Sequence, residues 1–417
     1  MSKPKIFVFT TSYYPFIGGA EIAIQEVAQR LAREFNFFIV TSRIRRSLPR
    51  REIRPEGTVV RLGFGTRFDK WLLPVLAPLY LVLSSKFQVP GSVLWGMDIS
   101  QGSLAAAGIK FLYPRIPLVL TVQYGEHERR LRSGRFGMIG GAFRLMLGRA
   151  DRLTAISRYL VRLSRDFGYC GPATLIHNGA EMNKFKVQSS EFKVTNQNSK
   201  VIITVSRLVP KNGVDILIRA IAEVKKKIPD VRCQIIGDGA ERDNYRSLVN
   251  EYGLERHITF LGEISHDELP RYLHNADIFV RPSRSEGMGN AFVEALAAGL
   301  SIIGTPVGGI PDIIEDGKTG LLARVDDPQD LAEKIISIFN NPSYGQTLSR
   351  TGLEKIEKKF SWDNIAGEYR AIFHQALGAK RRVVVATGLF PPEIGGPATY
   401  SNLLVDELPQ QIGRAHV

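Results

Sequence analysis

The feature that most constrains the fold is a regular alternation of short, continuously apolar runs with longer amphipathic stretches. In the first half we expect buried strands at residues 6–9, 37–40, 93–95 and 118–122, with helical patterns such as 20–35 between them. The second half repeats this organisation at residues 201–206, 231–237, 258–262, 277–282 and 301–306. Continuous apolar runs separated by helices are typical of parallel sheets covered on both faces. The pattern predicts an α/β protein with doubly wound, Rossmann-like sheets.

The length of the chain and one polar segment suggest how these elements are divided. A chain of 417 residues is too long for one average domain, so two are expected. The polar segment 186–200 is the natural linker, and the helical pattern 361–377 is expected to close the second domain. Two such domains leave a cleft between facing carboxyl ends of strands, where doubly wound sheets bind ligands.

The last residues repeat the first ones. Residues 383–408 echo residues 6–31 at a constant offset, so that Pro392 corresponds to Pro15 and Gly395-Gly396 to Gly18-Gly19. The copy stops soon after it begins. We expect residues 379–417 to be a truncated repeat of the N-terminal motif, from a tandem fusion or two genes run together, and to be disordered or loosely docked.

Charge is distributed unevenly. The chain has a net charge of +14, and residues 1–190 hold 28 Lys and Arg against 12 Asp and Glu. Basic surfaces attract a phosphorylated substrate, an anionic membrane surface or nucleic acid, although a merely soluble basic face is the alternative. Nucleic acid is not expected as a partner, since zinc-finger spacing and an aromatic-rich RNA-binding signature are both missing.

The apolar stretch 71–85 is too short for a membrane span and is broken by Pro74 and Pro78. It fits equally a helix that touches a bilayer and a buried helix of the first domain. The chain opens without a secretory signal and contains only Cys170 and Cys233, which suits a reducing cytosol. We therefore expect a cytoplasmic protein, peripheral at the inner face of the membrane if α-helical residues 71–85 touch lipid.

The block 282–309 carries the chemistry. Gly287 and Gly289 let the backbone approach a ligand closely, and Asn290 is expected to cap a helix that Gly299 ends. The N-terminus of such a helix suits a phosphate. Glu286 and Glu294 flank this turn, and carboxylates accept hydrogen bonds from sugar hydroxyls. The arrangement fits a nucleotide sugar; the alternative is one solvated loop acid and one helix-surface acid.

This block resembles the E-x7-E signature of retaining glycosyltransferases with the GT-B fold, particularly glycosyltransferase family four. The similarity continues through residues 13–21, 155–160, 176–185, 205–221, 235–245 and 260–283. The resemblance implies an acceptor-binding domain at residues 1–190 and a nucleotide-sugar-binding domain at 191–378. It also implies transfer of a sugar, with retention, from a nucleotide-sugar donor to a glycan or lipid-linked acceptor. Such reactions serve cell-surface polysaccharide or glycolipid biosynthesis.

The resemblance assigns roles to individual residues. It gives Arg207 and Lys211 the neutralisation of the donor diphosphate, which needs fixed positive charge against the leaving group. It gives Glu294 the ribose hydroxyls and Glu286 the transferred sugar, and it names Glu286, Arg207 and Lys211 as the catalytic residues. The donor would also contact the N-terminal glycine loop and the start of the helix, at Gly18, Gly19, Gly287, Met288, Gly289, Asn290 and Ala291.

The chain departs from the family pattern at two points. The family's lysine usually follows the arginine by five residues, where this chain has Asn212 after Lys211. The strand at 117–128 usually ends in a histidine near the acceptor, where this chain has Gln123. We expect Glu21, Gln123 and His127 on the acceptor side, with His127 at the rim.

No metal or other cofactor is expected, because no D-x-D motif is placed to hold one and Arg207 with the helix N-terminus supplies the positive charge. Two alternatives remain open: a non-catalytic nucleotide-sugar-binding protein, and a nucleotide-sugar epimerase of the same fold.

Overall fold

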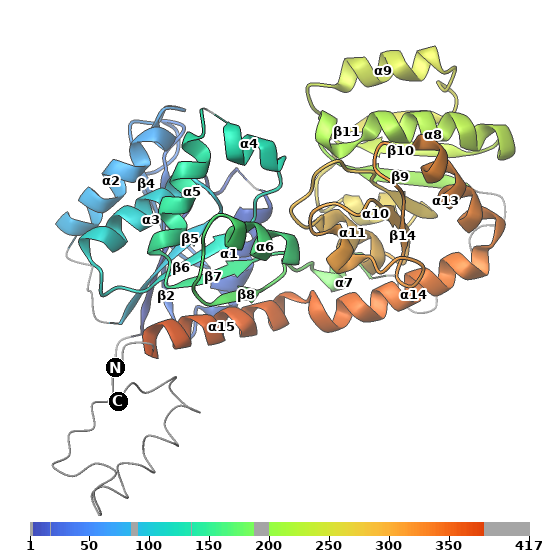
Figure 1. Ribbon diagram of the computed structural model, residues 1–417. Coiled ribbons are helices and arrows are strands. Elements are labelled where there is room, and N and C mark those ends of the chain that lie inside the picture. The colour runs from blue at the N-terminus through green and yellow to red at the C-terminus, as the bar shows by residue number, and fades with distance from the viewer. Residues whose placement is uncertain (1–2, 17, 85–90, 135, 187–199, 379–417) are drawn as a thin grey trace, which may run out of the picture.

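A computed structural model of the chain describes residues 3–16, 18–84, 91–134, 136–186 and 200–378 (Figure 1). It shows two α/β domains, each built on its own mainly parallel sheet with helices on both faces. The two doubly wound, Rossmann-like domains expected from the alternating pattern are therefore confirmed. The expected truncated repeat at 379–417 and most of the expected linker lie outside the described residues.

The first sheet has eight strands in the order β3-β4-β2-β1-β5-β6-β7-β8, and every neighbouring pair is parallel except β3 with β4. Its inner strands are buried along nearly their whole length because helices cover both faces. The strands are β1 (Lys5–Phe9), β2 (Asn36–Ser42), β3 (Arg51–Arg54), β4 (Gly57–Leu62), β5 (Ser92–Met97), β6 (Leu118–Val122), β7 (Arg152–Ala155) and β8 (Ala173–Leu175). The antiparallel edge strand β3 comes from the arginine-rich segment, which showed no strand pattern.

Serine side chains cap the starts of two helices in this domain. The Ser100 and Ser157 side chains accept hydrogen bonds from the backbone N–H groups of Ser103 and Leu160, and so cap α3 and α6. The helices are α1 (Gly19–Leu31), α2 (Asp69–Leu83), α3 (Gln101–Leu112), α4 (Glu128–Ser133), α5 (Met138–Arg149), α6 (Arg158–Asp166) and α7 (Met182–Phe185).

The second sheet has six strands, all parallel, in the order β11-β10-β9-β12-β13-β14. Its strands are β9 (Val201–Val205), β10 (Arg232–Ile236), β11 (Ile258–Gly262), β12 (Ile278–Val280), β13 (Ser301–Gly304) and β14 (Leu321–Leu322). Its helices are η1 (Pro210–Asn212, a 3-10 turn), α8 (Val214–Lys227), α9 (Arg242–Glu251), α10 (Leu269–Leu273), α11 (Asn290–Ala297), α12 (Ile310–Ile313), α13 (Pro328–Asn340) and α14 (Pro342–Lys359). The five strands expected in this half all form.

The last helix, α15 (Trp362–Gly378), does not close the second domain as expected from the sequence. It crosses back and packs along the first domain, next to α1 and β5 (Figure 1). Trp362, Tyr369 and Phe373 are buried in one hydrophobic cluster with β1 and β2 residues, and the Phe373 ring lies 5.2 Å from that of Trp95. The apolar face of α15 therefore belongs to the first core.

The two places where the chain passes between the domains are joined to each other. The backbone N–H of Ala180, after β8, donates to the carbonyl oxygen of Phe360, before α15, over 3.0 Å. The His177 ring stacks on the Phe360 ring with centroids 4.8 Å apart. The described parts of the two connections between the domains are therefore in contact with each other.

Both sheets reverse their strand order beside their first strand, between β1 and β5 in one and between β9 and β12 in the other. Ligands of doubly wound sheets bind outside the carboxyl ends of strands at such switch points. The loops after these four strands are where a site is expected, and they contain the glycine loop, Asp98, Arg207 with Lys211, and the E-x7-E block.

Candidate active site

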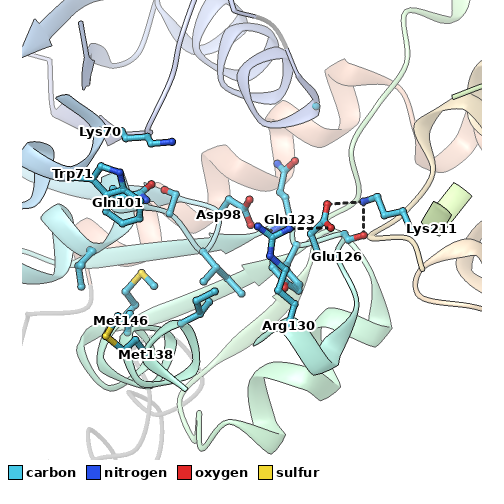
Figure 2. A pocket seen from close by; sticks show the side chains of 18 of the residues that line it. Lys70, Trp71, Asp98, Gln101, Gln123, Glu126, Arg130, Met138, Met146 and Lys211 are labelled. Atoms are coloured by element: carbon cyan, nitrogen blue, oxygen red, sulfur yellow. Dashed lines mark hydrogen bonds and ion pairs between the residues drawn. The ribbon is translucent and has the colours of Figure 1, made fainter. Parts of the chain in front are cut away.

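Two adjoining cavities lie between the domains at these switch points. The larger has a volume of about 780 Å³ and the smaller about 420 Å³. Five residues line both and are called the junction here: Gly19, Asp98, Gln123, Gly125 and Glu286. The larger cavity extends into the first domain between α2, α3 and α5, and Figure 2 shows the side chains around it. The smaller is closed on one side by the start of α11.

The start of α11 differs from the expectation. Asn290 is the first helical residue and not the cap, since Gly289 precedes the helix with φ 93° and no side chain caps it. A positive φ of this kind favours glycine, so Gly289 sets the turn. Gly299 likewise follows the last turn with φ 80°, one residue beyond Ala298. The expected donor-binding run from Gly287 to Ala291 lines the smaller cavity throughout.

Glu286 is fixed at the junction by an arginine that the sequence analysis missed. Its Oε2 lies 2.5 Å from Nη2 of Arg281, which follows β12, and its Oε1 accepts the backbone N–H of Gly287 over 3.1 Å. Arg281 also donates to Oδ1 of Asn212 over 3.2 Å. Both partners of the ion pair are largely buried, so the carboxylate has one defined orientation. The only signal for Arg281 in the sequence was its position, as a basic residue at the end of a strand and five residues before Glu286.

Arg207 and Lys211 both line the larger cavity, so Lys211 reaches the site despite its shifted position. Lys211 crosses the cleft: its Nζ donates to the carbonyl oxygen of Gly125 over 2.7 Å and to Oε1 of Glu126 over 2.9 Å (Figure 2). Arg207 Nη2 lies 3.9 Å from the same Glu126 oxygen. Burial raises the pKa of Glu126, but the hydrogen bond from Lys211 and the charges of Lys211, Arg130 and Arg207 bring it below the ordinary value.

Glu294, the second glutamate of the motif, lines neither of the two cavities. One turn into α11, its Oε1 lies 3.1 Å from Nε2 of His266. The other nitrogen of that ring lies 3.0 Å from Nζ of Lys184, on α7. The structure therefore places Glu294 outside the junction, in a polar cluster that also reaches the first domain.

The N-terminal glycine loop faces α11 across the cleft. A Cβ atom placed on Gly19 would lie 3.8 Å from the side-chain amide nitrogens of Asn178 and Asn290. Glu21 lines the smaller cavity, and its oxygens accept the backbone N–H of Gly18 over 2.9 Å and the hydroxyl of Ser12 over 2.8 Å. Glu21 thus shapes the loop, whereas Gly18 lines neither cavity.

The other two expected acceptor-side residues behave differently from each other. Gln123 is at the junction, where its amide exchanges hydrogen bonds with Asn178 over 3.0 and 3.3 Å. His127 lies before α4 and lines a separate surface cavity with Arg129 and Arg130. It lines neither of the two cavities of the candidate site.

Asp98 is at the junction and was also missed by the sequence analysis. It follows β5 with φ 62°, a conformation that residues other than glycine seldom adopt. Burial raises the pKa of its carboxyl above the ordinary value, and the charge of Glu21 raises it further, whereas the backbone N–H groups of Ile99 and Gln123 lower it. Its place at the carboxyl end of a strand beside a switch point was the available signal.

Comparisons with known proteins assign the chain to a family. Residues 17–184 match the family model described as Glycosyltransferase Family 4, and residues 186–355 match that described as Glycosyl transferases group 1. An uncharacterized glycosyltransferase of Methanocaldococcus jannaschii is 34% identical over 62% of this chain and 69% of its own length. A GDP-mannose-dependent phosphatidylinositol monomannoside mannosyltransferase of Mycobacterium tuberculosis is 25% identical over 63% of this chain and 72% of its own length.

Solved structures show the same fold. Sucrose-phosphate synthase from Thermosynechococcus elongatus superposes with a TM-score of 0.76 at 22% identity, covering 91% of this chain and 100% of that one. The Anabaena protein HepE in complex with UDP-glucose superposes with a TM-score of 0.70 at 19% identity, covering 89% of this chain and 99% of that one. These likenesses confirm the expected GT-B fold. Together with the two family models, which cover both domains, they show that the chain is a glycosyltransferase and belongs to glycosyltransferase family four.

Proposed function

We propose that this enzyme is a retaining glycosyltransferase that moves a sugar from a nucleotide-sugar donor to a glycan or lipid-linked acceptor. One observation carries the proposal: Arg207, Lys211, Glu286 and the start of α11 all converge on the two adjoining cavities. Two cations and a helix N-terminus suit a diphosphate, and a fixed carboxylate beside them suits sugar hydroxyls. The family's relatives are named as transferases, which does not favour the binding-protein and epimerase alternatives.

Stabilising the departing diphosphate is the main catalytic task. As the bond from the anomeric carbon to the phosphate oxygen breaks, negative charge grows on the phosphate, and fixed positive charge lowers the energy of that transition state. Arg207 and Lys211 supply two charges and the amides at the start of α11 supply a dipole. We infer that the acceptor attacks from the face on which the diphosphate leaves, which preserves the anomeric configuration.

The part of the larger cavity between α2, α3 and α5, away from Lys211, is suited to an acceptor with an apolar part. Leu104, Met138, Ile139 and Met146 give it an apolar wall, and it ends at Lys70 and Trp71 of α2 (Figure 2). An amphiphilic acceptor can place its sugar at the junction and its lipid against this wall. The mycobacterial relative is named for a phosphatidylinositol-linked acceptor, which is consistent with a role in glycolipid or cell-surface polysaccharide synthesis.

The α2 helix has one buried and one exposed side. Leu73, Ala77 and Leu81 are buried against the first domain, whereas Val75, Leu79 and Leu83 are exposed. Phe64 and Phe68, which precede α2, are also exposed, as are Phe111 and Leu112 at the end of α3, which packs on α2. The guanidinium of Arg149 lies 4.6 Å from the centre of the Phe111 ring, and Arg67 is exposed next to Phe68. No helix among the described residues has the length and hydropathy needed to cross a bilayer. We propose that this apolar and basic face rests on an anionic membrane, which would place the enzyme at the inner leaflet.

A panel of UDP-, GDP- and ADP-sugars tests the donor proposal, scored for nucleoside diphosphate release with and without phosphatidylinositol vesicles. One donor should be consumed faster with vesicles, the product should keep the anomeric configuration by NMR, and EDTA should leave the rate unchanged. Arg207→Ala and Lys211→Ala should each lower the rate of nucleoside diphosphate release at least about tenfold, since each removes a charge-assisted contact of roughly 1.5–3 kcal/mol. Absence of turnover with every donor, or an inverted product, would contradict the proposal.

Flotation with anionic and neutral vesicles at several salt concentrations tests the membrane proposal. The triple change Val75→Ser, Leu79→Ser and Leu83→Ser should weaken binding to anionic vesicles. Ile53→Ser, an equally exposed apolar residue on β3, is the matched control and should bind like the unmodified protein. Equal binding to neutral and anionic vesicles would remove the electrostatic part of the proposal.

A further inference from the structure

The smaller cavity, which the start of α11 closes on one side, has a single cation in its wall. Among the described residues that line it, only Arg281 has a basic side chain, whereas Glu21, Asp98 and Glu286 have acidic ones. A phosphate against the helix start would meet these three carboxylates, so it needs a positive charge close by. The inference below rests on the proposed function, in which the phosphates of a nucleotide sugar lie against that helix start.

The two cations assigned to the donor from the sequence belong to the other cavity. Arg207 and Lys211 line the larger cavity, and neither lines the smaller one. Lys211 is held across the cleft, where its Nζ donates to the carbonyl oxygen of Gly125 and to Oε1 of Glu126. Both cations can contact a diphosphate that extends past the junction. The phosphate oxygens nearest to α11 therefore need a cation from another position.

Arg281 reaches the smaller cavity from the end of β12. Its side chain is largely buried, and its Nη2 lies 2.5 Å from Oε2 of Glu286 and 3.2 Å from Oδ1 of Asn212. Its Nη1 has no hydrogen-bond partner among the described residues, and its Nε is buried without one. Since buried polar groups are usually hydrogen-bonded, the guanidinium keeps donors for a further acceptor.

Asn212 stands where the family usually has a lysine, and it is buried and uncharged. Its Nδ2 donates to the carbonyl oxygen of Arg207 over 2.7 Å, while its Oδ1 accepts from Arg281. The guanidinium of Arg281 thus brings a positive charge next to the position at which the family has one.

We propose that Arg281 binds the donor phosphate that is bonded to the transferred sugar. Its ion-pair partner Glu286 is the residue assigned to that sugar, so the adjoining phosphate comes within reach of the guanidinium. When the bond from the anomeric carbon to the phosphate oxygen breaks, its electron pair stays on that oxygen, and the fixed charge of Arg281 stabilises it. Arg281 is then a catalytic residue, and Arg207 and Lys211 contact the diphosphate from the larger cavity.

Two variants separate this role from mere support of Glu286. Glu286→Gln is the reference, and Glu286→Gln/Arg281→Gln removes the cation without leaving a buried charge unpaired. The probe is whichever of UDP, GDP and ADP binds the unmodified protein most tightly, and titration calorimetry gives its Kd. The double variant should bind the probe about 10- to 100-fold more weakly than Glu286→Gln, the loss expected for a charge-assisted hydrogen bond. The matching nucleoside monophosphate, which lacks the terminal phosphate, should bind both variants about equally.

The matched control is Arg271→Gln, which removes an exposed arginine of α10 that lines neither cavity. It makes the same change in net charge and should bind the probe like the unmodified protein. Equal affinity of Glu286→Gln and the double variant for the diphosphate would overturn the assignment. So would an equal loss for the monophosphate, because the contact would then not be to the terminal phosphate.

A crystal structure of the unmodified protein with the same diphosphate tests the contact without any substitution. A guanidinium nitrogen of Arg281 should lie within about 3.2 Å of an oxygen of the terminal phosphate. A diphosphate bound at α11 while Arg281 contacts only Glu286 and Asn212 would overturn this inference alone. If none of the three diphosphates binds the unmodified protein, the proposed function falls and this inference with it, so the two failures are distinguishable.

Discussion

The Nζ atom of Lys211 lies 2.9 Å from Oε1 of Glu126, so a carboxylate of the first domain holds the cation of the second domain that we propose as a donor ligand. Glu126 and a diphosphate would compete for that charge. Glu126→Gln should therefore tighten binding of nucleoside diphosphate by about two- to fivefold, since partly exposed ion pairs are worth about 0.2–1 kcal/mol. Titration calorimetry measures this change in affinity. Glu128→Gln removes a surface pair with Arg132 and should change nothing; weaker binding by Glu126→Gln would contradict the competition.

Arg281 should be needed for transfer although its contacts are internal. Arg281→Ala leaves Glu286 largely buried without its cation, and breaking a buried ion pair costs about 3–5 kcal/mol. We expect a lower melting temperature together with at least a tenfold loss of transfer. Arg281→Lys keeps the charge but not the second contact to Asn212. Its melting temperature and transfer rate should therefore lie between those of the unmodified protein and those of Arg281→Ala. An Arg281→Ala protein with normal kcat would show that Glu286 needs no such support.

Asp98 should destabilise the fold at neutral pH. Its pKa is raised in the folded protein, so the folded state holds this proton more tightly than the unfolded state does. The stability that this gives is present below the ordinary aspartate pKa and is lost as the pH rises through the raised one. Asp98→Asn should therefore melt higher than the unmodified protein at pH 7, by about 2–4 °C for each kcal/mol. Scanning calorimetry between pH 4 and 8 should show the difference shrinking toward the acidic end.

Phe373 should stabilise the first domain although it belongs to the last helix. Its ring packs 5.7 Å from that of Phe35 and 5.2 Å from that of Trp95, and it is fully buried. Phe373→Ala should lower the free energy of unfolding by about 3–5 kcal/mol, as for other large-to-small core changes. Phe64→Ala, at an exposed position, is the control. Denaturation followed by tryptophan fluorescence reports on the first domain, because Trp71 and Trp95 belong to it and Trp362 is buried in its core. An unchanged midpoint would mean that α15 packs only loosely.

The sequence predicted those parts of the site that local pattern determines. The alternating apolar runs predicted the sheets, and the glycine turn between Glu286 and Glu294 predicted a ligand-binding loop. The prediction for Asn290 was wrong because asparagine and glycine both favour helix starts, and only the backbone shows that Gly289 takes the positive φ.

Contacts between distant segments could not be predicted in this way. Glu126 follows β6, and only the facing of the two domains brings it to Lys211. The packing of Tyr369 and Phe373 on the first domain was missed because an amphipathic pattern shows that a helix has an apolar face but not which core receives it. Asp98 was missed because it belongs to no motif, although the switch-point rule points to the strand it follows.

The hydrogen bond from Ala180 to Phe360 has a mechanical consequence. Because the two segments are hydrogen-bonded to each other, any motion of one domain relative to the other that keeps this bond would bend both segments together, close to Ala180 and Phe360. Sliding or twisting of one domain past the other would break this hydrogen bond. Under such a bending motion the distance between the glycine loop and α11 would change, while Gly19 would stay opposite Asn290.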